Sequence, residues 1–159
     1  MKEILLIAGL AAAPVAVSTL QGRDAKVPDP VDPRLVRLEQ YFAQRDCPLQ
    51  NAARDFLAAA DKNALDWRLL PSISMIESSG GKDYRNNNVF GWDSCNESFS
   101  SVREGIHFVA TRLAQSDLYK GKSLDAKLKT YNPSPDYQHK VKAVMAALGP
   151  SDLGLGALD

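Results

Sequence analysis

Side chains that commonly bind metals are scarce in this sequence. Its 159 residues include two cysteines, Cys47 and Cys95, and two histidines, His107 and His139. No Cys-x-x-Cys pair occurs, so the ligand spacings typical of zinc sites are missing. We therefore expect no metal site and no cofactor, and we interpret both histidines as surface or hydrogen-bonded residues.

An excess of charge of either sign is also missing. Nineteen Lys and Arg residues balance nineteen Asp and Glu residues, so charge does not favour nucleic acid or an anionic membrane as a partner. The length is that of one ordinary domain, which excludes several large catalytic domains. Hydrophobic residues make up 45% and charged residues 24%, a balance typical of a globular protein. We expect a monomer.

Only one long apolar run is present, from Ile4 to Val17. It contains Gly9 and Pro14 and falls short of the roughly 20 apolar residues that span a bilayer. Such a run is typical of a secretory signal. We expect residues 1–18 to be a signal peptide, with export to the periplasm or the cell exterior and no stable membrane insertion after cleavage. An uncleaved anchor is the alternative.

Apolar residues recur at helical spacing in six segments, and no segment shows the convincing alternation of a strand. A proline-rich linker at residues 19–33 precedes them, and a loose tail at residues 149–159 follows. We therefore expect a mostly α-helical single domain over residues 34–148. The predicted helices cover residues 33–47, 53–60, 67–76, 101–113, 123–131 and 135–148. Asp32, Asp66 and Ser101 are the predicted caps of three of these helices, and Ser123 begins a fourth.

A polar stretch from Gly81 to Phe99 separates the third and fourth predicted helices. A loop of this length is uncommon in a compact domain unless it is functional or contains a small hairpin. Pro71 lies inside the third predicted helix, where it would remove a backbone donor and bend the helix. The stretch therefore predicts either a functional loop or a small hairpin lobe.

Glu77 is predicted to end the apolar face of the third helix. Leu70 and Ile73 lie about two turns and one turn before it, so the three residues share one face. Burial of a carboxyl raises its pKa, which suits a general acid at neutral pH. The alternative is a carboxylate that turns out to solvent at a helix end.

The segment from Leu70 to Gly81 resembles the catalytic helix of lysozyme-like enzymes that cleave peptidoglycan, in which an apolar helix ends in Glu-Ser-x-x-Gly. Asn88-Val-Phe-Gly-Trp92 is similar to the Asn-x-Phe-Gly element of the bacterial endo-β-N-acetylglucosaminidase family (mannosyl-glycoprotein endo-β-N-acetylglucosaminidase-like). Residues 131–141 resemble its closing Tyr-x-x-x-Pro-x-Tyr-x-x-x-Val pattern. Ser79, Trp92 and the lack of a Trp before Gly81 depart from the family and resemble lytic transglycosylases.

The resemblance implies a lysozyme-like helical fold with a cleft over residues 34–148, and a glycosidase that hydrolyses β-1,4 bonds of peptidoglycan strands. Glu77 would protonate the glycosidic oxygen, and Tyr131 would assist beside the reacting sugar. A second carboxylate could be Asp83, Asp93 or Glu97, of which we favour Asp93. Assistance from the acetamido group of the substrate is the alternative.

The predicted sugar contacts lie in the polar loop and the closing motif. Glycan clefts commonly present aromatic faces to sugar rings, and Trp92 is the strongest candidate because its neighbours are polar. The full set is Ser78, Tyr84, Asn88, Phe90, Gly91, Trp92 and Tyr137.

Export would place Cys47 and Cys95 in an oxidising compartment, where a disulfide persists. We expect them to be bridged, and two buried thiols are the alternative. Two other functions also stay open. One is a lytic transglycosylase, in which the sugar's own 6-hydroxyl attacks and leaves 1,6-anhydro-muramic ends. The other is a non-catalytic module that binds the cell wall.

Overall fold

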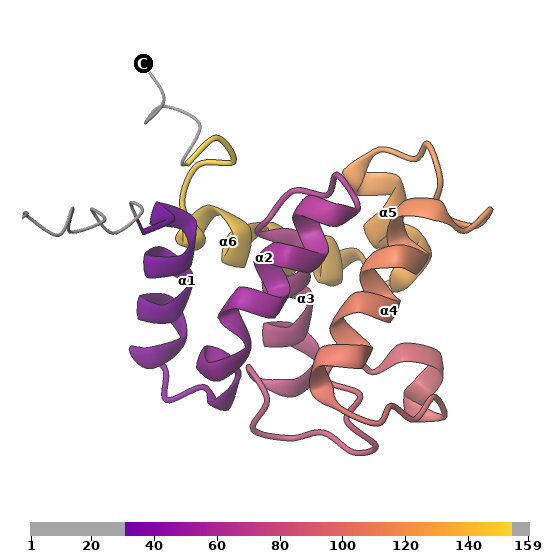
Figure 1. The fold of residues 1–159 in the computed structure, drawn as a ribbon. Helices are drawn as coiled ribbons and strands as arrows, with labels where there is room; N and C mark the ends of the chain where they lie inside the picture. Colours follow the sequence, from indigo (N-terminus) through magenta and orange to yellow (C-terminus); the bar gives the residue numbers. More distant parts are fainter. Residues whose placement is uncertain (1–30, 154–159) are drawn as a thin grey trace, which may run out of the picture. The chain divides into compact units, whose positions relative to one another are not determined.

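Residues 31–153 are described by a computed structural model, which contains six α-helices and no strand in that range (Figure 1). The mostly helical prediction is therefore confirmed for these residues. The expected signal peptide at residues 1–18 and the linker up to residue 30 lie outside the described residues. The elements are α1 (Pro33–Ala43), α2 (Ala53–Lys62), α3 (Leu69–Ser78), α4 (Val102–Gln115), α5 (Leu124–Tyr131) and α6 (Pro135–Leu148), with 3-10 helices η1 (Pro48–Ala52) and η2 (Trp92–Cys95).

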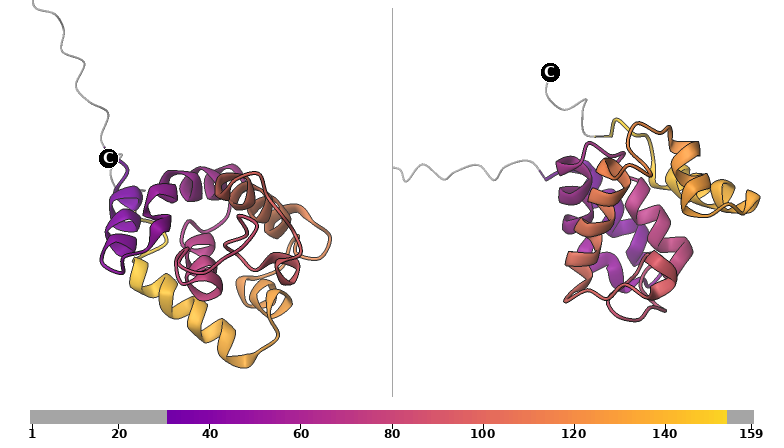
Figure 2. Two further views of the ribbon diagram at one scale, coloured as in Figure 1. Left: turned by 90° about the horizontal axis from the view of Figure 1, so that it is seen from below. Right: turned by 90° about the vertical axis from the view of Figure 1, so that its right-hand side faces the viewer.

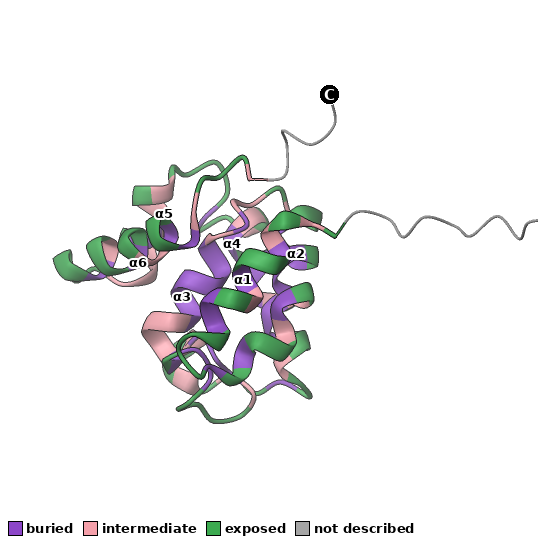
Figure 3. Cartoon of the chain, turned by 90° about the vertical axis from the view of Figure 1, so that its left-hand side faces the viewer, coloured by how far each residue is buried: buried purple, intermediate pink, exposed green. Residues whose placement is uncertain are grey.

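Helix α3 lies at the centre, and the other helices are arranged around it (Figure 2). Seven of its ten residues are buried, and it packs against α2 and α6. Figure 3 shows that its early turns are buried and that its last turn is half-buried. The apolar residues Leu70 and Ile73 therefore anchor a helix whose last turn, with Glu77, reaches the edge of the core.

Side-chain caps define the start of three helices where the sequence predicts them. Each cap accepts a hydrogen bond from a backbone N–H that has no partner within its helix. The pairs are Asp32 Oδ1 with Arg34 N (2.8 Å), Ser101 Oγ with Glu104 N (3.1 Å) and Ser123 Oγ with Ala126 N (3.3 Å).

Pro71 does not interrupt α3 because the helix begins later than predicted. Leu69 is its first residue, so Pro71 lies in the first turn, where backbone N–H groups have no partner in the helix. Asp66, the predicted cap, instead accepts the backbone N–H of Arg68 at 3.0 Å and pairs with its guanidinium at 2.6 Å. The predicted bend is therefore wrong.

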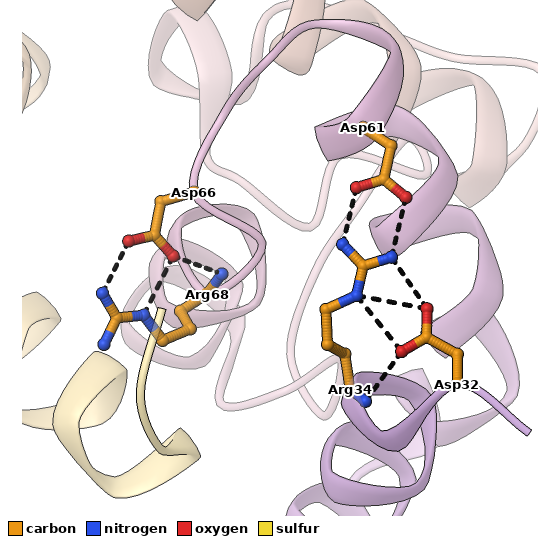
Figure 4. Close-up of polar contacts among 5 residues, drawn as sticks. All are labelled: Asp32, Arg34, Asp61, Asp66 and Arg68. Atoms are coloured by element: carbon orange, nitrogen blue, oxygen red, sulfur yellow. Dashed lines mark hydrogen bonds and ion pairs between the residues drawn. The ribbon is translucent and has the colours of Figure 1, made fainter. Parts of the chain in front are cut away.

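Two arginines connect parts of the chain that are distant in sequence (Figure 4). Arg34 pairs with Asp32 and with Asp61, both at 2.7 Å, which joins the start of α1 to the end of α2. Arg68 donates a hydrogen bond to the carbonyl of Gly149 at 2.8 Å. These contacts fix the helix ends on the side of the domain where α6 ends.

The loop between α3 and α4 is held closed by its own hydrogen bonds and forms no hairpin within the described residues. Phe99 N donates to Asn86 O at 2.9 Å, and Asn87 Nδ2 donates to Phe99 O at 2.9 Å. Its middle contains the single 3-10 turn η2. The hairpin alternative is therefore wrong, and the polar stretch is an ordered loop.

The expected disulfide is not formed. Cys47 is a buried free thiol whose Sγ lies 3.7 Å from Met75 Sδ and packs against Gly80. Cys95 is a half-buried free thiol in η2, where its carbonyl accepts a hydrogen bond from Asn86. The two cysteines therefore pack into different surroundings, Cys47 beneath the end of α3 and Cys95 within the loop.

The first residues of the predicted loose tail are packed. Residues 149–153 form a turn after α6, and Leu153 is partly buried against the core. Residues 154–159 lie outside the described range. Among residues 31–153, no helix combines the length and the apolar character needed to cross a membrane.

Candidate active site

A cleft of about 660 Å³ opens beside the last turn of α3. Its walls come from α3, the loop with η2, α4 and the chain at the end of α5. The site therefore brings together Glu77, part of the Phe-Gly motif and the first tyrosine of the closing motif. The lining residues are Glu77, Gly91, Trp92, Asp93, Ser94, Glu97, Phe108, Arg112, Ser116, Leu118, Tyr119, Tyr131 and Asn132.

Glu77 combines access to the cleft with partial removal from water. It occupies the last turn of α3 and is half-buried. Burial raises the pKa of its carboxyl, and the hydroxyl of Tyr137 opposes part of this rise. A carboxyl with a raised pKa keeps its proton closer to neutral pH and can deliver it to a bound molecule.

Tyr137 lies behind the carboxyl rather than on the wall of the cleft. Its side chain is 4% exposed, and its ring stacks on that of Tyr131 with centroids 5.9 Å apart and 6° between the planes. Its hydroxyl makes no hydrogen bond of standard geometry with another described residue. Tyr137 therefore does not belong to the lining of the cleft, and its hydroxyl acts on the pKa of Glu77.

Tyr131 lines the cleft, and its hydroxyl donates a hydrogen bond to the carbonyl of Phe90 at 2.6 Å. Burial, followed by the charge of Glu77, raises the pKa of its phenol well above the ordinary value. The side chain is therefore a neutral hydroxyl at neutral pH, and it is held in one orientation. It can position or hydrogen-bond a neighbouring group, but it does not supply a phenolate charge.

Trp92 is surrounded by other aromatic rings. Its ring centroid lies 5.7 Å from that of Tyr131, 6.0 Å from that of Tyr119 and 6.2 Å from that of Phe108. Trp92 is half-buried and lines the cleft, which is the position predicted for it. These four rings all line the cleft and form its aromatic wall.

Gly91 lets the loop backbone approach the carboxyl of Glu77. Its φ of +61° lies in the left-handed region, and a Cβ at this position would lie 2.9 Å from Glu77 Oε2. Any side chain here would push against the carboxylate. The glycine of the Phe-Gly element therefore allows the loop to lie close to the Glu77 carboxyl.

Three predicted sugar contacts are structural instead. The Phe90 ring is 0% exposed and packs in the core. Asn88 is 1% exposed and hydrogen-bonds both the N–H and the carbonyl of Trp92 at 2.9 Å, which holds the loop. Ser78 is buried and donates to Ser74 O at 2.9 Å. These three side chains therefore face the interior and do not belong to the lining of the cleft.

The polar loop contributes two of its three candidate carboxylates to the cleft. Asp93 and Glu97 line it, whereas Asp83 does not. Tyr84 is 43% exposed and also lies outside the lining, so the structure does not bring it to Glu77. Asp93 therefore stays a candidate second carboxylate, together with Glu97.

The wall supplied by α4 and the turn after it was not predicted. Phe108 and Arg112 lie four positions apart, beside the buried stripe of Val109 and Leu113, so their spacing could have placed them on one shared face. Tyr119 lies in the turn between α4 and α5, where no periodic signal exists. The sequence therefore held a signal for two of these three residues.

Comparison with known proteins adds no relative: neither a protein-family model nor a curated protein matches this sequence. Functional interpretation therefore depends on the residues around the cleft and on the motifs that they belong to.

The contact between Gly91 and Glu77 can be measured by substitution. We expect Gly91→Ala to lower the free energy of unfolding by about 2 kcal/mol, since the added Cβ strains a left-handed backbone and forces the Glu77 carboxyl, the end of a flexible side chain, to move. Gly121→Ala is the matched control, because its φ is +72° and nothing lies within 4 Å of a Cβ there. Its loss should be only about 1 kcal/mol in the same urea titration. Equal losses for the two variants would contradict the close approach of Gly91 to the carboxyl.

The raised pKa of Glu77 should make stability depend on pH. Below the unfolded-state pKa the carboxyl is protonated in both states, so its burial has no electrostatic penalty there. As pH rises, the unfolded state ionises first, and the folded state loses relative stability. We expect Glu77→Gln to gain stability over the wild type as pH rises above about 4, where the carboxyl of the unfolded state begins to ionise, measured by denaturant unfolding. A stability difference that does not change with pH would contradict the burial of Glu77.

Proposed function

We propose that the protein is an exported peptidoglycan glycosidase of lysozyme-like fold that hydrolyses β-1,4 bonds of the glycan strand, with Glu77 as general acid. The observation that carries this proposal is a half-buried carboxyl of raised pKa on the wall of a cleft with aromatic rings. The glucosaminidase-like motifs around Glu77, Gly91 and Tyr131 support the choice of substrate.

The arrangement of helices also supports the proposal. In the resemblance described above, an apolar helix carries the acid at its end, and here α3 is buried at the centre with Glu77 in its last turn. The rigid core would hold the acid in a fixed position, while the loop and α4 would shape the walls that contact the substrate.

In the proposed reaction, protonated Glu77 donates its proton to the glycosidic oxygen while the bond from that oxygen to the anomeric carbon breaks. The bonding electron pair leaves with the oxygen, which departs as a hydroxyl group, and positive charge develops at the anomeric carbon. The oxygen of a water molecule then bonds to the anomeric carbon, and the proton that this water loses passes to a carboxylate of the cleft, which restores the starting protonation of the site. Asp93 or Glu97, both in the cleft, would stabilise the charge or activate this water, unless the acetamido group of the sugar does so.

Two neighbours would keep the acid ready for proton transfer. The Tyr137 hydroxyl limits the rise in the pKa of Glu77, and the missing side chain of Gly91 leaves the space that one oxygen of the carboxyl occupies. Tyr131, held by its hydrogen bond to the loop, would present a neutral hydroxyl beside the sugar. Trp92, the half-buried ring of the aromatic wall, would offer its face to the pyranose C–H groups.

The role of Glu77 can be tested by an isosteric substitution. We expect Glu77→Gln to reduce the digestion of purified glycan strands by at least ~100-fold, because the amide keeps the shape but cannot donate the proton. Asp83→Asn is the matched control, since Asp83 is a carboxylate on the loop that follows α3 and lies outside the cleft, and it should retain near wild-type activity. Digestion by Glu77→Gln at the wild-type rate would refute the assignment.

The bond that is cut can be identified from the new ends of the products. We expect hydrolysis to leave N-acetylglucosamine at the reducing end, because the Asn88 to Gly91 and Tyr131 to Val141 elements look more like glucosaminidases than like transglycosylases. Borohydride reduction followed by mass spectrometry should therefore yield glucosaminitol ends. Products with only 1,6-anhydro-muramic ends, which are lighter by one water than hydrolysed muramic ends, would instead identify a lytic transglycosylase and leave the role of Glu77 intact.

A further inference from the structure

Arg112 is the one cationic side chain among the described residues that line the cleft. It also borders a second hollow of about 340 Å³ on the surface of α4, and Phe108 and Ser116 line both spaces with it. Arg112 therefore lies where the cleft continues along α4, and it forms no ion pair with the three carboxylates that the α3 and loop walls provide.

The guanidinium of Arg112 is held in place by an aromatic ring but has no anionic partner among the described residues. None of the ion pairs among residues 31–153 involves it, and it donates no hydrogen bond to a described residue. The guanidinium carbon lies over the Phe108 ring, 4.9 Å from its centroid, a cation–π contact that restricts the side chain. A side chain held in this way loses little freedom when it binds an anion.

We infer, on the basis of the proposed function, that Arg112 is a specificity-determining residue that binds a carboxylate carried by the glycan strand. A guanidinium forms two parallel hydrogen bonds with a carboxylate, which suits an exposed site better than a single contact does. Muramic acid residues carry such a group on the lactyl ether when it is free, or on the attached peptide. A neutral polymer of N-acetylglucosamine carries none, so Arg112 would favour peptidoglycan over chitin-like strands.

The test compares three substrates: neutral chitin oligosaccharides, glycan strands stripped of peptides so that the lactyl carboxylates are free, and strands that keep their peptides. We expect Arg112→Gln to lower the ratio of kcat/KM for carboxylate-bearing over neutral strands by about tenfold, mainly through KM. Arg112→Lys should restore part of the ratio, because the charge returns without the paired donors. If the ratio falls more for the peptide-free strands, Arg112 binds the lactyl carboxylate. If it falls more for the strands that keep their peptides, Arg112 binds a peptide carboxylate.

Arg103→Gln is the matched control. Arg103 lies on the same helix and pairs with Asp55 at 3.4 Å outside the cleft, so its loss should leave the ratio unchanged. A fall of equal size on neutral and charged strands, no fall on either, or an equal fall for Arg103→Gln would overturn the inference.

If the wild type cleaves none of the strands, the proposed function fails, and binding then decides the role of Arg112. Isothermal titration with carboxylate-bearing and neutral fragments would compare the wild type with Arg112→Gln. A selective loss of affinity for the carboxylate-bearing fragments would still support the inference. Equal affinities of the two proteins, or no binding by either, would overturn it.

Discussion

Burial of the first two turns of α3 is the constraint on which the candidate site depends. Leu70 and Ile73 are fully buried at the centre of the helices, so α3 cannot rotate or slide without opening the core. Glu77 follows on the same helix, and its position is therefore fixed by apolar packing two turns away. The loop and α4 therefore shape the walls of the cleft, while the position of Glu77 is fixed by α3.

The same arrangement sets a conflict between stability and chemistry at Glu77. Removing a carboxyl from water disfavours its charged form, and a fold selected only for stability would replace such a group or expose it. In this structure the residues around Glu77 reduce the cost of burying its carboxylate only in part. The Tyr137 hydroxyl lowers the pKa of the carboxyl in part, while the close Gly91 backbone leaves no room for an additional side chain.

Helices and their starts were the most predictable features, because their signals are local. Asp32, Ser101 and Ser123 form the capping hydrogen bonds that their positions predict. Glu77 on the apolar face was predictable for the same reason, since its helical spacing from Ile73 is visible in the sequence. Pro71 was misread because the first turn of α3 begins two residues after the predicted start, and helix ends are the least certain feature of a periodic pattern.

The loop was less predictable, because side-chain direction there depends on contacts from distant segments. Phe90 and Trp92 are near neighbours in one polar stretch, yet the first enters the core and the second lines the cleft. Asn88 looked like a sugar ligand, but its amide holds the loop backbone. The pairing of Cys47 with Cys95 was equally open, since a pair of cysteines in a sequence carries no information about the distance between them in the fold.

The two ends of the described domain are joined through Arg37. Its guanidinium donates hydrogen bonds to the carbonyls of Leu148 and Ala147, both at 2.9 Å, so that α1 is fastened to the last turn of α6. Tension applied through the chain at both ends would load these hydrogen bonds and that of Arg68 with Gly149, which all lie at the end of α6. The residues that line the cleft lie between the two loaded ends of the chain, and none of them makes these contacts.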